Sequence, residues 1–490
     1  MSVPLTIVDS VLTAEEPTMT ICIANASWVI SWDGTIARQR YLRNVDVAFD
    51  EDQIVFIGER YGGECSERID GRRLLLMPGL INLHTHPWSE ALNKGFADDF
   101  GNPALGFMAM YDMMPGWVES KKSSTVSATV AYSEMLKSGV TTTVDSSPPY
   151  DGWIDLVAKS GIRCFFGPCM SSAVWNRSGT DSFGYDWHAD DGASRFDVAL
   201  SIIDEACCHN SGRLSGVVFP EQVDTCTAAF LRKSADAAAT RSLPTQIHAA
   251  QSVPEYLEMQ RRHGCSPIAW MDDIGFLGPR LTVSHGIFVN DHSWINHAGN
   301  DVERLARAGT SVAHCPTVFA RTAAALEGFA RYRAAGINIG IGTDTFPHNM
   351  LEEMRLAMYL ARVDARSIEG TTTSDIFEAA TVGGANALGR LDLGRLAVGA
   401  KPDIVVVDLD EPLMQPTRDP LRSLLSTASD RAVRDVIIGG AFVVRNRKVM
   451  TLDYAGALGE LNSLAQSNEN MIPKIDVLHR TGLMLAPLSL

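Results

Sequence analysis

Two histidines end an apolar run in the first fifth of the sequence. The segment "MPGLINLHTHPWSEAL", residues 77–92, places His84 and His86 on either side of Thr85. Side chains of a strand alternate between its two faces, so both imidazoles point to one side and Thr85 points away. Paired imidazoles at this spacing suit a transition-metal ion. The pair therefore predicts part of a metal site, and two separately buried histidines are the alternative.

Four other polar residues end short apolar runs further along the chain. They are His248 in "PTQIH", His285 in "TVSH", His314 in "SVAH" and Asp344 in "IGIGTD". Each of them alone is typical of a half-buried polar residue. In a parallel barrel, however, the carboxyl ends of the strands converge on one face, whatever their separation in sequence. Strands arranged in this way would bring all four side chains to the histidine pair.

The elements that position these residues alternate between helix and strand. In "SSTVSATVAYSEMLKSGVTTTVDSS", a helix with a Ser/Thr start stops at Gly139 and a β-branched strand then runs to Asp145. Repetition of this unit predicts an α/β fold, a (β/α)8 barrel of the TIM type, which needs about 250 residues plus insertions. We assign the barrel to residues 77–399.

Both ends of the chain have a different pattern. Residues 1–76 alternate apolar and polar positions around turn sequences such as Asp33-Gly34, which predicts hairpins. Residues 400–454 contain similar strands, "KPDIVVVDLD" and "VRDVIIGGAFVVRNRKVM". The two segments predict one small β-sandwich domain built from both termini. The tail, residues 455–490, is expected to pack on the barrel or on a neighbouring subunit.

The composition of the 490 residues narrows the class of partner. An apolar fraction of 46% with 20% charged residues is that of a soluble globular protein. The net charge of −16, with no local Lys/Arg cluster, argues against nucleic acid and anionic membranes as partners. No apolar run approaches the ~20 residues of a membrane span, and the nine cysteines lack metal-ligand spacing. A cytoplasmic protein that binds a small molecule is expected.

The motifs, taken in order, resemble the amidohydrolase superfamily, and within it the ATZ/TRZ-like branch of triazine hydrolases and aminohydrolases. The likeness runs from about Trp28 to about Asp453 and includes "MPGLINLHTH", "IHAAQS", "VSHGIFVND", "VAHCPT", "GIGTDTF" and "DLGRLAVGAKPDIVVVD". It implies a metal-dependent hydrolase that acts on carbon–nitrogen bonds other than peptide bonds. The barrel and the terminal β-sandwich inferred above agree with it.

The resemblance also implies a set of metal ligands, namely His84, His86, His248 and Asp344. Three imidazoles and a carboxylate suit Zn²⁺, which we predict, and Fe²⁺ or Co²⁺ tolerates the same set. Relatives with two metals bridge them through a carbamylated lysine at the end of the fourth strand. The corresponding segment, "RLSGVVFPEQVDTCT", contains no lysine. One divalent ion is therefore expected.

The ion and two side chains would carry the chemistry. A divalent ion of this kind lowers the pKa of bound water to about 7. Asp344 is then expected to accept the proton of the water and pass it to the leaving group. His285 is expected to hydrogen-bond the attacking water or the tetrahedral oxyanion. His314 resembles a histidine that lies beside the ligands or faces the substrate.

One position departs from the family pattern. Aromatic aminohydrolases of this branch place a glutamate three residues after the third metal-binding histidine, where it passes a proton to a ring nitrogen. This chain has Gln251 there, and an amide does not exchange a proton near neutral pH. The sequence therefore favours hydrolysis of an amide, urea, carbamate or lactam bond, with Gln251 orienting the substrate.

The alternative is deamination, amine displacement or dehalogenation of an N-heteroaromatic ring such as a triazine, purine or pyrimidine. Glu221 or Glu90 would then have to replace the missing acid, although a surface carboxylate is the plainer interpretation of either. A catalytically inactive structural relative is disfavoured because the set of metal ligands is intact.

The segment after His86 is rich in Trp, Phe and Met. Trp88, Phe100 and the methionines between 108 and 114 are expected to line the substrate site as an apolar wall, which favours a bulky and largely neutral substrate. The alternative is that they pack a helix on the barrel or form a subunit contact. A homodimer or homotetramer is expected because closed symmetric assemblies are the commonest.

Overall fold

The computed structural model of the protein describes residues 19–96, 101–108, 110–111, 121–177, 179, 181–476 and 478–490. The middle of the described chain is an α/β structure with two four-stranded parallel sheets. The first has the order β13-β10-β9-β8 and consists of Leu80–Thr85 (β8), Val140–Asp145 (β9), Arg163–Phe166 (β10) and Leu214–Gly216 (β13). The second has the order β14-β15-β16-β17 and consists of Thr245–Ala249, Leu281–His285, Ser311–His314 and Ile339–Ile341.

Isolated parallel bridges link the edges of these two sheets. One joins Thr85, at the end of β8, to Asp344, which follows β17. Two more join the segment beyond β13 to β14, pairing Val218 with Thr245 and Gln222 with His248. The strands are buried on both faces, as parallel strands are when helices cover them. Side chains at their carboxyl ends therefore share one rim.

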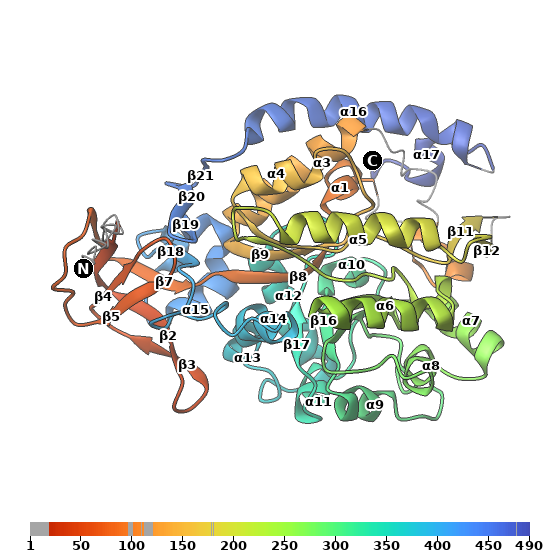
Figure 1. Ribbon diagram of the computed structural model, residues 1–490, viewed down its shortest axis with the longest axis horizontal. Helices are drawn as coiled ribbons and strands as arrows, with labels where there is room; N and C mark the ends of the chain where they lie inside the picture. Colours follow the sequence, from red (N-terminus) through yellow and green to blue (C-terminus); the bar gives the residue numbers. More distant parts are fainter. Residues whose placement is uncertain are drawn as a thin grey trace, which may run out of the picture.

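Helices follow the strands along the chain and cover the two sheets (Figure 1). They are α1 (Pro87–Glu90), α3 (Lys121–Lys137), α4 (Trp153–Ser160), α5 (Ala193–Cys207), α6 (Ala228–Arg241), α7 (Val253–His263), α8 (Pro267–Asp273), α9 (Asp301–Ala308), α10 (Pro316–Ala320), α11 (Phe329–Ala334), α12 (Met350–Ala365), α13 (Thr373–Glu378) and α14 (Gly384–Ala387). The predicted stop at Gly139 is confirmed, since α3 ends at Lys137 and Gly139 has a left-handed φ of 89° before β9 begins.

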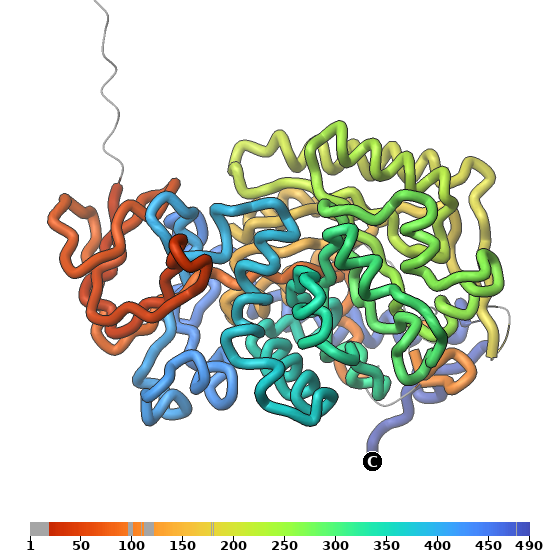
Figure 2. Tube along the Cα trace, turned by 90° about the horizontal axis from the view of Figure 1, so that it is seen from below, coloured from red at the N-terminus to blue at the C-terminus, as the bar shows by residue number. Residues whose placement is uncertain are grey.

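Strands from both ends of the chain come together beside the parallel sheets, where Figures 1 and 2 show the N-terminal segment next to part of the C-terminal one. A seven-stranded sheet has the order β21-β20-β19-β18-β7-β2-β3. Its strands are Trp28–Asp33 (β2), Arg38–Leu42 (β3), Leu74–Pro78 (β7), Ile404–Asp408 (β18), Val433–Ile438 (β19), Ala441–Arg445 (β20) and Lys448–Val449 (β21). The predicted turn at Asp33-Gly34 is confirmed, because Asp33 pairs with Arg38.

A second terminal sheet has the order β5-β4-β1-β6 and comes from the N-terminal segment alone. Its strands are Ile21–Ala26 (β1), Val45–Phe49 (β4), Ile54–Gly58 (β5) and Glu67–Asp70 (β6). An apolar cluster that includes Ile23, Val47, Leu76 and Ile404 combines buried residues of both sheets. The boundaries that divide the chain at residues 76, 399 and 454 stay predictions.

The C-terminal tail forms the long helix α16 (Tyr454–Ile475), and α17 (Gly482–Leu485) follows it. Helix α16 lies along α3, and Ala457 and Leu461 pack there with Val126 and Val130 of α3 (Figure 1). In the described part of the chain, none of the helices combines the length and the apolar character that a membrane crossing requires.

Candidate metal centre

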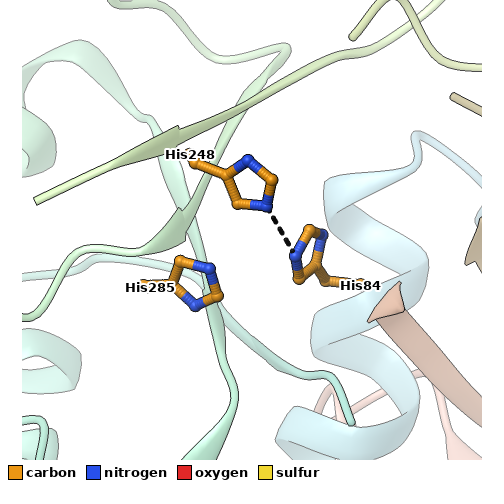
Figure 3. Close-up of side chains that lie close together, drawn as sticks. All are labelled: His84, His248 and His285. Carbon is orange, nitrogen blue, oxygen red and sulfur yellow. Dashed lines mark hydrogen bonds between the residues drawn. The ribbon is translucent and has the colours of Figure 1, made fainter. Parts of the chain in front are cut away.

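Four imidazoles and one carboxylate meet at the rim where the two parallel sheets are joined. His84 belongs to β8 and His86 follows it, His248 belongs to β14, His285 ends β15, and Asp344 follows β17. Figure 3 shows the rings of His84, His248 and His285 turned toward one another. The Nε2 atom of His248 lies 3.1 Å from that of His84 and 3.3 Å from that of His86. The structure thus brings these strand ends together, as the parallel topology led us to expect.

Asp344 completes the cluster. Its Oδ1 atom lies 3.4 Å from His84 Nε2 and 3.3 Å from His86 Nε2. Ligands about 2.0–2.1 Å from a tetrahedral zinc ion are about 3.3–3.4 Å apart, so these separations match the edges of such a coordination shell. Two overlapping groups of donor atoms, His84–His248–His285 and His84–His86–Asp344, are each compact enough to hold an ion.

In His84, His86 and His248, the protein holds the opposite nitrogen of the imidazole. His248 Nδ1 donates to the Glu221 carbonyl at 2.7 Å, and His86 Nδ1 donates to the Ser146 carbonyl. His84 Nδ1 lies 3.2 Å from Gln246 Oε1. A proton on Nδ1 leaves Nε2 with a lone pair, and lone pairs this close repel one another unless a cation lies between them. The donor set therefore fits a divalent metal ion.

Burial and neighbouring charges set the protonation of the acid–base candidates. Burial opposes ionisation of Asp344, but the adjacent His285 and His84 imidazoles hold the pKa of its carboxyl well below its usual value. Burial lowers the pKa of His285 to about 3, so its imidazole is neutral at pH 7. Its Nε2 lies 3.9 Å from Asp344 Oδ2. A carboxylate and a neutral imidazole thus face the same point.

The backbone turns sharply where these two side chains enter the site. His285 has a φ of 82° and Asp344 a φ of 59°, both in the left-handed region that residues other than glycine seldom adopt. His285 also stacks on His248, with an interplanar angle of 7°, and its ring makes a T-shaped contact with Phe319. Strain of this kind is commonly found at functional sites, where the surrounding structure maintains it.

A cavity of about 490 Å³ opens beside the cluster, which is a suitable size for a small molecule. Its apolar lining includes Trp88, Met108, Met110, Trp175 and Phe319. Its polar lining includes His86, Glu90, Arg195, Glu221, Gln222, His248, Gln251, His285, Arg321 and Asp344. Six of these residues belong to the site residues predicted from the sequence, so the cavity adjoins the candidate metal site.

A model of the amidohydrolase family matches residues 75–443, a span that contains the whole cluster. The chain belongs to the amidohydrolase family. It is therefore a metal-dependent hydrolase that acts on carbon–nitrogen bonds, as the sequence motifs predicted.

Curated relatives of this amidohydrolase include deaminases. The 5-methylthioadenosine/S-adenosylhomocysteine deaminase of Desulforudis audaxviator is 29% identical over 86% of this chain and 94% of that protein. The enzyme of the same name from Halobacterium salinarum is 28% identical over 84% of this chain and 90% of that protein. Relatives at this distance leave the substrate open.

Solved structures share the fold. An adenosine deaminase from Xanthomonas campestris with bound zinc superposes with a TM-score of 0.79 at 24% identity, over 93% of this chain and 99% of that one. Zinc-bound atrazine chlorohydrolase from Arthrobacter aurescens TC1 superposes with a TM-score of 0.77 at 23% identity, over 91% of this chain and 100% of that one.

The remaining predicted residues of the amidohydrolase differ in position. Trp88 and Gln251 line the cavity, whereas Phe100 lies outside the described residues. His314 is buried at the end of β16 and packs on Phe329, and the described lining of the cavity does not include it. Burial lowers the pKa of His314 to about 4. Its contact with substrate stays a prediction.

Sequence reasoning missed Gln222 and the two arginines that line the cavity. Gln222 follows Glu221 in the loop beyond β13, and Arg195 lies in the first turn of α5. Arg321, just after α10, donates to Thr345 Oγ1 at 3.2 Å and stacks over Phe346. No motif marks these positions, because tertiary packing determines which side chains outside the strand ends reach the cavity.

Proposed function

We propose that this amidohydrolase hydrolyses an amide, urea, carbamate or lactam bond of a small and largely apolar or aromatic molecule. The observation that carries the proposal is the amide of Gln251, which lines the cavity beside the metal cluster where aromatic aminohydrolases have a glutamate. Cleavage of such a bond requires that the leaving nitrogen receives a proton. It does not require the protonation of a ring nitrogen for which aromatic aminohydrolases use their glutamate. The carboxylate of Asp344 can meet that need alone.

The proposed roles follow from the contacts. His84, His86, His248 and Asp344 hold one divalent ion, most simply zinc, which supplies a Lewis acid and lowers the pKa of water. Asp344 stays ionised among the imidazoles, accepts the proton of the water and delivers it to the leaving nitrogen. Neutral His285 donates a hydrogen bond to the oxygen that becomes negative as the carbonyl is attacked.

The walls of the cavity support a bulky and uncharged substrate. Trp88, Met108, Met110 and Trp175 present rings and thioethers to it. Methionine and aromatic side chains adapt to apolar groups without fixing their orientation. Orientation would then come from the amides and from the metal.

Displacement of an amine from an N-heteroaromatic ring is the second candidate. Two observations favour it. Several curated relatives are named deaminases of adenosine-type compounds. Glu90 lines the cavity, and burial raises the pKa of its carboxyl to about 7, which suits a general acid at neutral pH.

The two parallel sheets and the two terminal sheets also support a proposal for the architecture. We infer a closed (β/α)8 barrel, supported by the bridges Thr85–Asp344 and Val218–Thr245 between the two parallel sheets. A β-sandwich of the two terminal sheets is supported by their shared apolar cluster. A cytoplasmic homodimer or homotetramer remains our expectation from sequence and symmetry.

Purified protein loaded with zinc tests the proposed function. It is incubated separately with amides, ureas and lactams and with aminotriazines, chlorotriazines and aminopurines, and amine, ammonia and halide are measured. Turnover of the first group alone is the expected result. Release of ammonia or halide from the rings without turnover of any amide or urea would replace the proposal with the second candidate.

A further inference from the structure

Two glutamine side chains lie against each other in the cavity. Gln251 Nε2 donates to Gln222 Oε1 at 2.6 Å, and both residues line the substrate space. Their residues are only 4% and 7% exposed, so this polar contact is shielded from bulk water. Both glutamines lie close to the predicted metal ligand His248. Gln222 forms an isolated parallel β-bridge with His248, and Gln251 follows His248 by three residues.

The backbone around Gln251 is fixed by the carboxyl of Glu255. Glu255 Oε1 accepts from Ala250 N at 2.6 Å, and Oε2 accepts from Gln251 N at 3.4 Å. Ala250 has a φ of 52°, so this carboxyl holds a turn that residues other than glycine seldom adopt. Gln251 therefore enters the cavity from a turn whose backbone N–H groups are hydrogen-bonded to Glu255.

The mutual hydrogen bond determines which donor and acceptor groups of the two glutamines remain for a ligand. A glutamine amide has two N–H donors and one oxygen acceptor. The mutual bond uses one N–H of Gln251 and the oxygen of Gln222. The oxygen of Gln251 and the N–H₂ of Gln222 remain for a ligand. If nitrogen and oxygen were exchanged in both amides, the pair would still offer one acceptor and one donor.

We propose that Gln222 and Gln251 together determine specificity by binding an uncharged amide-type group that carries both an N–H donor and a C=O acceptor. Primary amides, lactams and ureas have this combination, whereas esters and ketones lack the donor. The proposal rests on the proposed function and names the feature of the substrate that this site selects. Gln222 acts both as a donor to the substrate and as the residue that orients Gln251.

The surroundings explain why an amide suits position 251. Glu255 and Asp224 are both buried. Burial raises the pKa of the Glu255 carboxyl well above its usual value, and the nearby carboxyl of Asp224 raises it further. An ionised glutamate at position 251 would place a negative charge beside these two buried carboxyls at low dielectric. A neutral amide avoids that repulsion and still offers hydrogen bonds.

Binding of two isosteric probes tests the inference. Benzamide and acetophenone differ only in an NH₂ group that replaces a methyl, so only benzamide can donate to the Gln251 oxygen. With zinc-loaded protein, calorimetry should show benzamide binding about three- to tenfold more tightly, the range expected for one net neutral hydrogen bond. In Gln251→Leu the ratio of the two affinities should fall to about one.

Two variants of Gln222 separate its two roles. Gln222→Leu removes the partner that orients Gln251, so the preference for benzamide should be lost. Gln222→Glu keeps an acceptor for Gln251 Nε2 but removes the donor, so both probes should bind more weakly while the preference remains. Thermal unfolding checks that each variant is folded.

Three results would overturn the inference. They are no binding of benzamide to the wild-type protein, equal binding of the two probes, and a preference that survives in both leucine variants. Release of ammonia from benzamide in the same samples bears on the proposed function alone. Failure of the reaction and failure of recognition are therefore separate outcomes.

Discussion

The backbone of Asp344 is hydrogen-bonded on both sides of Thr85. Asp344 N donates to the His84 carbonyl at 2.8 Å, and His86 N donates to the Asp344 carbonyl at 2.9 Å. Thr85 and Asp344 are 259 positions apart in sequence. The first two imidazoles and the carboxylate of the metal cluster thus share one rigid bridge between sheets, and their spacing depends on the residues that hold it.

The Asn82 side chain stabilises this bridge by two hydrogen bonds to Thr343, the residue before Asp344. Its Nδ2 donates to Thr343 Oγ1 at 2.8 Å, and its Oδ1 accepts from Thr343 N at 3.0 Å. Asn82→Leu leaves the buried N–H of Thr343 unpaired, which should lower the free energy of unfolding by about 1–3 kcal/mol and loosen the metal centre. Urea titration and metal analysis measure the two effects. The control is Asn338→Leu, which removes a partly buried amide away from the cluster and should leave the metal content unchanged.

Removal of one imidazole should empty the metal centre. Wild-type protein is expected to hold about one equivalent of divalent metal, and His84→Ala should lose it together with at least about a hundredfold of activity. His297 is exposed, so His297→Ala is the matched control and should keep both metal and activity. Elemental analysis after dialysis gives the stoichiometry. Two equivalents in the wild type would contradict a mononuclear site.

Gln246 should affect metal affinity without being a ligand. Its Oε1 lies 3.2 Å from His84 Nδ1, and its Nε2 donates to the Leu83 carbonyl at 2.8 Å. Residues that orient a ligating histidine commonly contribute about 10–100-fold to metal affinity. Gln246→Leu should weaken zinc binding by that factor, as measured by competition with a chelator. Gln246→Glu keeps an acceptor for His84 and should retain most of the affinity; equal losses in both variants would point to general disruption.

The sequence was sufficient to predict the convergence of the cluster. The two-residue period of a strand puts His84 and His86 on one face, and parallel strands put His248, His285 and Asp344 at the same rim. Both arguments use information that one sequence supplies: the two-residue period of a strand, and the repeated strand–helix order that predicts a parallel sheet.

Features that depend on packing were not predictable in the same way. "TICIANASWVISW" contains β1 and most of β2, which belong to different sheets and are separated by a bend at Ser27. Asn25, with a φ of 56°, lies where the register of β1 is irregular. The antiparallel hairpin β11–β12, Ala173–Arg177 and Phe183–Trp187, carries Trp175 into the cavity, and Gln222 enters from a loop. Loop paths follow from long-range contacts, for which a single sequence has no periodic signal.

Stability should depend on pH through Glu353 of α12. Burial raises the pKa of its carboxyl from 4.5 to about 8. The folded state therefore keeps a proton that the unfolded chain releases, and this contribution to stability is complete below about pH 4.5 and is lost as pH rises through about 8. Glu353→Gln should flatten the fall of Tm over this interval. Glu303 is exposed, and Glu303→Gln should leave the profile unchanged.

Gln251→Glu tests which bond the site can cleave. Burial and the carboxyls of Asp224 and Glu255 would raise the pKa of the new carboxyl, so it should be protonated near neutral pH and able to donate to a ring nitrogen. We expect this variant to release ammonia from an aminotriazine or aminopurine that the wild type leaves intact. That activity should decline as pH rises through the raised pKa, because the donor is then lost. Gln251→Leu is the control and should gain nothing; ring turnover by the wild type equal to that of Gln251→Glu would show that Glu90 or another group already supplies the proton.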